Sequence, residues 1–118
     1  MTDLITVANF SELDALVAER LLGLEVFRSN GKHYLDETGN TILPRYSLDI
    51  ALAWKVVESC SSQGIQLQIT PVGDNGGWQV KRVDTGIESK ETSASHKNVA
   101  TAICLAALKS IGTEIKWE

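Results

Sequence analysis

The chain is poor in the residues that cross-link small proteins or bind metals. Its 118 residues include two cysteines, Cys60 and Cys104, and two histidines, His33 and His96, with no CxxC or HExxH spacing among them. A disulfide framework or a zinc site needs more of these residues at closer spacing. We therefore predict two buried, reduced thiols, no metal and no cofactor.

Long hydrophobic runs and an excess of positive charge are also missing. No segment has the roughly 20 consecutive apolar residues of a membrane-spanning helix, and the first residues, MTDLITVANF, lack the basic start and apolar run of a signal peptide. The net charge is -4, whereas duplex-binding proteins carry a basic stripe that neutralises phosphates. We expect a cytoplasmic protein that binds neither a membrane nor a DNA or RNA duplex.

Sequence signatures of catalysis are absent as well. The chain has no GxGxxG, P-loop, HExxH or GxSxG. The glycine-rich GDNGG at 73–77 lies between two strand patterns, whereas a dinucleotide fingerprint leads from a strand into a helix, so we predict a turn there. The acidic pairs lack a flanking histidine and are predicted to be surface charge: Asp14 with Glu19, and Asp36 with Glu37. These patterns predict that the protein is not an enzyme.

Three segments do have the apolar spacing and the end signals of helices. Their predicted N-caps and terminating glycines are Ser11 and Gly23, Ser47 and Gly64, and Asn98 and Gly112. The second helix is apolar over nearly its whole circumference, which calls for two neighbours, such as a sheet plus another helix or another subunit. The third helix is small on one side and is expected to be largely buried.

The remaining segments favour strands. Residues 25–43 are predicted to form a β-hairpin around SNG or a long irregular segment. IQLQITPV and WQVKRV are predicted to form two strands joined by GDNGG. Residues 84–96 are a third short strand near 87–92 or a mobile loop, and the tail TEIKWE adds a strand or packs Trp117 on a neighbour. Strands joined by tight turns predict a single α+β domain over residues 1–118, with a mainly antiparallel sheet between helices.

One group of side chains is suited to binding a planar anion. Arg45 and Tyr46 precede the second helix, whose free N–H groups attract negative charge. Aromatic and basic groups that stack on or pair with a nucleotide occur at two further places. The seven candidates are Arg45, Tyr46, Trp78, Lys81, Arg82, His96 and Lys97. The alternative is that Trp54 and Trp78 are core aromatics and that the charges serve solubility.

Three blocks, ELDALVAERLLGLEV, YSLDIALAW and ATAICLAALKSIG, resemble the phage ABA sandwich domain, a family of small bacteriophage and prophage proteins. The resemblance covers residues 12–112. Two positions depart from the family pattern: Leu24 replaces the usual Trp of the first block, and NVATAIC lacks the Pro that opens the last helix. The family name implies an α-β-α sandwich. The family has no established activity, so the resemblance carries over no catalytic residues.

The resemblance implies a phage protein in the host cytoplasm, and small acidic phage proteins often act against host immunity. We therefore expect a homo-oligomer with an anti-defence role. It would bind and sequester a nucleotide-derived immune signal, such as a cyclic ADP-ribose isomer or a cyclic oligonucleotide, without catalysis. The alternative is a module that binds a host or phage protein and inhibits or tethers it.

Overall fold

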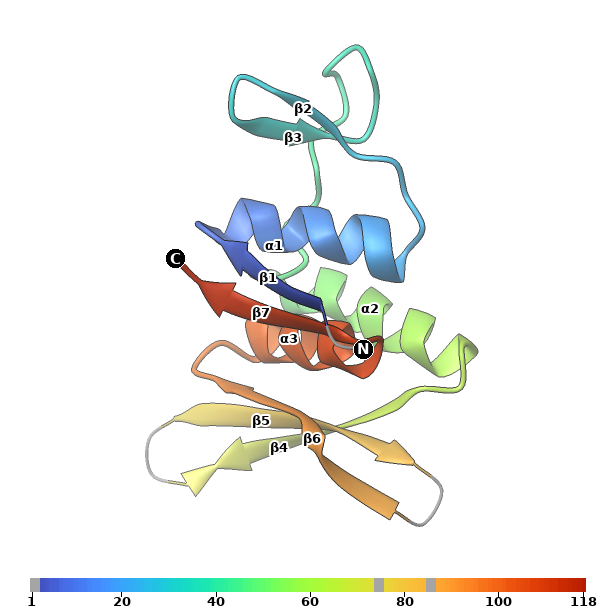
Figure 1. The fold of residues 1–118 in the computed structure, drawn as a ribbon, viewed down its shortest axis with the longest axis vertical. Coiled ribbons are helices and arrows are strands. Elements are labelled where there is room, and N and C mark those ends of the chain that lie inside the picture. The colour runs from blue at the N-terminus through green and yellow to red at the C-terminus, as the bar shows by residue number, and fades with distance from the viewer. Residues whose placement is uncertain (1–2, 74–75, 85–86) are drawn as a thin grey trace.

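The computed structural model describes residues 3–73, 76–84 and 87–118. Helices and strands are interspersed along the chain (Figure 1). They are β1 (Asp3–Val7), α1 (Phe10–Leu16) with a π-helical turn (Val17–Leu21), β2 (Phe27–Ser29), β3 (Lys32–Tyr34), α2 (Ile50–Ser62), β4 (Gln66–Val72), β5 (Gly77–Asp84), β6 (Ile87–His96), α3 (Val99–Ser110) and β7 (Thr113–Trp117). The α+β class predicted from the sequence is confirmed.

The described strands form three sheets. β4, β5 and β6 make an antiparallel sheet, β2 and β3 an antiparallel hairpin, and β1 and β7 a parallel pair. The parallel pair joins the two ends of the chain, with Asp3 opposite Thr113 and Val7 opposite Trp117. In Figure 1 the hairpin and the three-stranded sheet lie at opposite ends of the molecule, with the helices between them.

α3 lies at the centre of the fold. It packs on β5 and β6 and also against α2 and β7. Ile103 and Leu108 are fully buried there, and Val80 of β5 is equally buried on the sheet. On the opposite face of β4, Gln66, Gln68 and Thr70 are exposed. The period-2 pattern of β4 therefore separates a face that packs on helices from a polar outer face.

The ends of the helices are confirmed at four predicted positions and corrected at two. Asn98 caps α3, and Gly23, Gly64 and Gly112 follow their helices with positive φ. The N-caps predicted at Ser11 and Ser47 were wrong. Asn9 Oδ1 instead accepts a hydrogen bond from Glu12 N at 3.0 Å, and Asp49 Oδ1 accepts one from Ala51 N at 2.9 Å. Asparagine and aspartate cap at least as well as serine, and both serines make other contacts, described below.

The structure contains one strand, β1, that the sequence did not predict. β1 was not predicted, because its partner β7 lies at the other end of the chain and gives no local signal. Residues 87–96 form a strand that is longer than predicted and pairs with β5. The GDNGG turn and the start of the 84–96 segment include residues 74–75 and 85–86, which lie outside the described residues.

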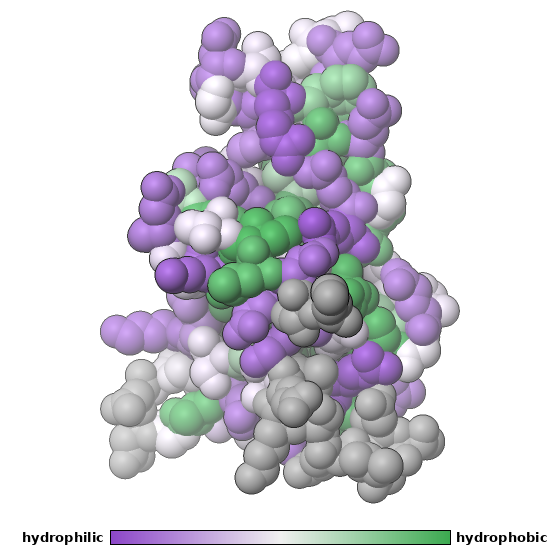
Figure 2. All heavy atoms as spheres, in the orientation of Figure 1, coloured by the Kyte–Doolittle hydropathy of each residue, from purple (hydrophilic) through white to green (hydrophobic). Residues whose placement is uncertain are grey.

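The surface differs between the middle of the molecule and the hairpin end. Figure 2 shows hydrophobic side chains in the middle of the face that carries β1 and β7, and mainly hydrophilic ones around the hairpin.

The two thiols are free and buried as predicted, with Cys60 1% and Cys104 0% exposed. Within residues 3–73, 76–84 and 87–118, no helix has the length and apolar character needed to cross a membrane.

Candidate functional site

A groove lies between α1 and the β2–β3 hairpin. Two cavities of about 440 and 600 Å³ lie along it. Both are lined by Asn9 at the start of α1 and by Gly31, Lys32 and His33 of the hairpin. We call the two cavities together the hairpin groove.

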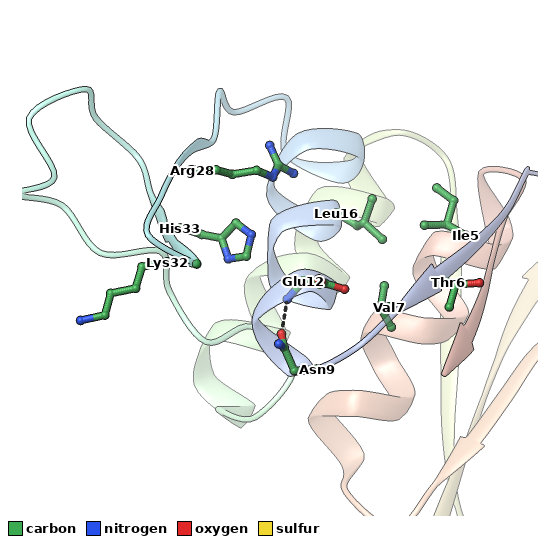
Figure 3. Close-up of a pocket in the computed structure, with 10 residues that line it drawn as sticks. Ile5, Thr6, Val7, Asn9, Glu12, Leu16, Arg28, Lys32 and His33 are labelled. Atoms are coloured by element: carbon green, nitrogen blue, oxygen red, sulfur yellow. Dashed lines mark hydrogen bonds between the residues drawn. The ribbon is translucent and has the colours of Figure 1, made fainter. Parts of the chain in front are cut away.

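The smaller cavity lies between the hairpin, α1 and β1 (Figure 3). In Figure 3, His33 extends from β3 toward α1, whereas the side chain of Lys32 points away from α1. Arg28 also lines this cavity, but its Nη2 donates to Glu19 Oε1 at 2.6 Å. The guanidinium of Arg28 is therefore already paired within the protein.

The larger cavity has a mixed polar and apolar lining. Its polar side chains include Ser11, Asp14, His33 and Arg45, and its apolar side chains are Phe10, Tyr34, Ile42, Leu43 and Leu48. Ser11 Oγ lies 2.7 Å from His33 Nδ1, a hydrogen bond that joins α1 to the hairpin. The hairpin is thereby held over the helix, and the cavity lies beside this bond.

Asp14 is the buried acid of the larger cavity. Its side chain is 3% exposed, and Oδ1 accepts a hydrogen bond from the backbone N–H of Ser47 at 2.7 Å. Burial raises the pKa of the Asp14 carboxyl above its ordinary value, and hydrogen bonding from Ser47 and the charges of Arg45 and His33 oppose that rise. The prediction that Asp14 is surface charge was wrong, because Asp14 is buried in α1 together with its neighbours Leu13 and Ala15.

The hydrogen bond of Asp14 belongs to a longer buried chain of polar contacts. Thr101 Oγ1 of α3 donates to the backbone carbonyl of Ser47 at 2.7 Å, and both residues are fully buried. The Ser47 hydroxyl lies close enough to Asp14 to help lower the pKa of its carboxyl, although it makes no hydrogen bond of good geometry among the described residues. The segment before α2 is thus fixed to α1 on one side and to α3 on the other.

Turn chemistry positions the hairpin over the cavity. Asn30 and Gly31 both have positive φ, 51° and 76°, as a two-residue hairpin turn requires. Asp36 then holds the following loop. Its Oδ2 accepts from Thr41 Oγ1 at 2.6 Å, and its Oδ1 accepts from Asn40 N at 3.0 Å. This loop leads directly to Ile42 and Leu43, which form one wall of the larger cavity.

An exposed hydrophobic surface adjoins the larger cavity. A shallow hollow that runs from Ile42 and Leu48 to Ile50 continues from the cavity toward α2. The large apolar side chains exposed there are Ile42 at 74%, Leu48 at 39%, Ile50 at 50% and Trp54 at 52%. We call these four residues the apolar rim. Ile50 and Trp54 belong to the predicted wide apolar face of α2, and the described residues leave this part of the face exposed.

The structure separates Arg45 and Tyr46, which the sequence placed together. Arg45 is exposed and lines the larger cavity. Tyr46 is 5% exposed, and burial raises the pKa of its phenol. The candidate role of Tyr46 as a stacking ring is therefore corrected to a core role, because the chain turns inward between Arg45 and Ser47.

The other five candidates lie away from the hairpin groove. Trp78 and Arg82 are on the helix-facing side of β5 and Lys81 is on the other side, as the β4–β5 register shows. Arg82 Nη1 donates to the Ser110 carbonyl at 3.1 Å, at the end of α3. These three residues therefore do not converge on a single site.

His96 and Lys97 lie at the end of β6, just before α3. The His96 ring packs edge-on against Phe10, with 6.3 Å between ring centroids, and its Nδ1 accepts from Asn98 N at 3.0 Å. Phe10 in turn lines the larger cavity and contacts Trp117 at 5.1 Å between centroids. His96 is thus separated from the cavity by Phe10, and Lys97 is exposed beside it.

Three residues of the site were not identified from the sequence, namely Ser11, Asp14 and His33. A signal for two of them was present. Ser11 and Asp14 are three residues apart and so lie on one face of α1. His33 reaches them only through the hairpin, and that contact has no local sequence signal. No group of three or more metal-ligating side chains occurs in the described part of the chain.

Comparison with known proteins identifies the family. The model of the phage ABA sandwich domain matches residues 15–108. A solved structure, the 2.0 Å crystal structure of a phage protein from Bacillus cereus ATCC 14579, is similar with a TM-score of 0.72 and 22% identity, over 93% of this chain and 94% of that one. That likeness shows a shared fold. No curated protein matches the chain. Because the family model spans most of its length, the chain belongs to the phage ABA sandwich domain family.

Proposed function

We propose that the larger cavity of the hairpin groove binds a nucleotide-derived host immune signal and sequesters it without catalysis, as a counter-defence protein of the phage. The observation that carries the proposal is the lining of this cavity. It combines Arg45, His33 and Ser11 as cationic and hydrogen-bonding groups with an apolar wall around Phe10 and Leu48. A volume of about 600 Å³ is within the usual range for small-molecule sites.

The arrangement of Ser11, His33 and Asp14 favours binding over catalysis. Ser11 and His33 are at hydrogen-bond distance, as a nucleophile and its base would be. A catalytic histidine is also oriented by a carboxylate on its other nitrogen. Here the Oδ1 of Asp14 accepts a hydrogen bond from the backbone N–H of Ser47 and not from the His33 ring. The Ser11–His33 bond is better suited to holding the hairpin over the ligand than to activating the serine.

The apolar rim supports a homo-oligomer as the sequestering form. Ile42 and Leu48 line the cavity and are also part of the rim, so a second copy that covers the rim would also cover the cavity. Exposed hydrophobic surface of this kind usually marks an interaction site. The same observation favours the second candidate function, in which the rim binds a host or phage protein and inhibits or tethers it.

The test is an incubation followed by heat release. The protein is mixed with cyclic ADP-ribose isomers or cyclic oligonucleotides, the free fraction is filtered off, and the retained fraction is heated and analysed by liquid chromatography. We expect depletion of one signal and recovery of the intact molecule after heating. No depletion contradicts signal binding, and a cleaved product shows an enzyme.

The two candidate functions separate in a pull-down from host lysate. A single stoichiometric protein, captured by the wild type and lost in Trp54→Lys, would favour the interaction module. If the protein instead sequesters a signal, we expect Trp54→Lys to change the oligomeric state. We expect Arg45→Ala to lose the retained signal. Arg28→Ala is the matched control, because Arg28 lies in the smaller cavity and is paired with Glu19.

A further inference from the structure

We propose that the larger cavity presents Asp14 to an amino group of the ligand, so that it selects nucleotides whose base carries an exocyclic amine. This inference rests on the proposed function and specifies the class of ligand at the same site. The base would lie deep in the cavity against Asp14, and the phosphate would lie at the exposed guanidinium of Arg45.

The first support is the placement of the Asp14 carboxylate. It lines the cavity although its side chain is 3% exposed, so it lies at the inner end of the cavity. Oδ1 accepts from Ser47 N, and the Ser47 hydroxyl lies close to the same carboxyl group. That hydroxyl is the buried side-chain atom that lacks a hydrogen-bond partner among the described residues, and Asp14 Oδ2 is not such an atom. A ligand amine would donate to the carboxyl group where it lines the cavity.

The second support is the distribution of charge. An ionised Asp14 would repel a ligand that carried only negative charge, and the repulsion is strong in a low-dielectric position. Arg45 lies at the outer end of the cavity, where it also borders the hollow that leads to the apolar rim. A ligand with a hydrogen-bond donor at one end and an anion at the other therefore matches the cavity better than phosphate alone.

The third support is the chemistry of nucleobases. Adenine, guanine and cytosine have an exocyclic amine, whereas uracil and hypoxanthine have none. A hydrogen bond from such an amine to a carboxylate is charge-assisted and stronger than one between neutral groups. The apolar side chains of Phe10, Leu43 and Leu48 provide surfaces for the faces of a base. Selection would therefore come from the edge of the base, and affinity from its faces and the phosphate.

The experiment compares two nucleotides that differ only in the amine. AMP and purine riboside 5′-monophosphate are titrated into the wild-type protein, Asp14→Asn and Arg45→Ala, with binding followed by calorimetry and NMR. We expect the wild type to bind AMP about 10-fold more tightly, the size of one charge-assisted hydrogen bond. In Asp14→Asn the side-chain amide would place a donor against the amine, and the preference should vanish. Arg45→Ala should weaken both nucleotides by a similar factor.

The possible results distinguish a failure of amine selection from a failure of nucleotide binding. Equal affinity of the wild type for both nucleotides overturns the amine selection and leaves nucleotide binding in place. A preference for AMP that persists in Asp14→Asn overturns the role of Asp14. Failure of both nucleotides to bind at millimolar concentration overturns both proposals. If Asp14→Asn does not fold, as judged by circular dichroism, the wild-type ratio alone decides.

Discussion

The carboxylate of Asp14 accepts a hydrogen bond from the backbone N–H of Ser47 across 2.7 Å, and this bond ties α1 to the segment that enters α2. Both residues are buried, so a titratable carboxyl group is held inside the fold. Burying a charge costs free energy unless it is fully compensated. A buried carboxylate of this kind is more characteristic of a binding site than of a core built for stability.

The first prediction concerns the pH dependence of stability. The pKa of Asp14 is raised above its ordinary value of 3.8, chiefly by burial. Its contribution to folding is therefore complete below pH 3.8 and is lost as the pH rises through the raised native pKa. Asp14→Asn keeps an acceptor for Ser47 N without this loss. Relative to wild type, the variant should gain stability as the pH rises from about 3 to neutrality.

Urea denaturation of both proteins across that pH range measures the difference. Glu58→Gln, at an exposed position of α2, is the control for removing one acid. A difference between Asp14→Asn and wild type that stays constant with pH, or that shrinks as the pH rises, would be incompatible with the raised pKa.

The second prediction concerns the contact between α3 and Ser47. Thr101→Val keeps the shape of the side chain and removes the hydroxyl that donates to the Ser47 carbonyl. The buried carbonyl loses its donor, and the free energy of unfolding should fall by about 1–3 kcal/mol. Thr6→Val is the matched control, since Thr6 is exposed on β1, and should change stability by less than about 0.5 kcal/mol. Equal effects of the two substitutions would argue against the buried hydrogen bond.

The third prediction concerns the loop beside the cavity. The hydrogen bond from Thr41 holds the pKa of Asp36 at about 2, with further help from Thr38 and the Asn40 amide. A lowered pKa stabilises the loop above pH 3.8, and this contribution is lost as the pH falls through about 2. An NMR titration of the Asp36 carboxyl carbon should therefore have its midpoint near pH 2. In Thr41→Val the midpoint should move up toward 3.8, and an unchanged midpoint would show that Thr41 is not the cause.

The fourth prediction concerns the apolar rim. Trp54 is 52% exposed on α2 beside Ile50 and Leu48, and we expect a second copy of the chain to cover this surface. Analytical ultracentrifugation of the wild type should show an oligomer, and Trp54→Lys should sediment as a monomer. Lys55→Glu, one residue along the same helix, should leave the oligomer intact. A wild type that is monomeric at about 100 µM, a concentration at which micromolar dimers persist, contradicts this role of the rim.

Much of the fold was predictable because its signals are local. The periodic apolar residues of the helices, the glycines at their ends and the alternation in β4 each depend on neighbours within a few residues. The segment at 87–96 was less clear, because its polar sequence fits an exposed strand as well as a loop. β1 was missed, since it pairs with β7, which lies more than a hundred residues later in the chain.

The site was less predictable because tertiary contacts create it. Arg45 was identified from its place before a helix, and the structure puts it on the larger cavity. Tyr46 shared that signal, yet its side chain packs into the core. Ser11 and Asp14 fit a helix start equally well on sequence grounds. Their roles depend on His33 and Ser47, which are 22 and 33 residues away along the chain.

Native mass spectrometry of the protein purified from host cells that carry active defence systems tests whether the larger cavity holds a ligand. We expect an oligomer that retains a nucleotide-sized ligand, released intact by heating and absent from Arg45→Ala. The same spectrum for Arg28→Ala should keep the ligand. A wild-type protein without any bound small molecule, or one whose ligand survives Arg45→Ala unchanged, would contradict the assignment of the larger cavity as the binding site.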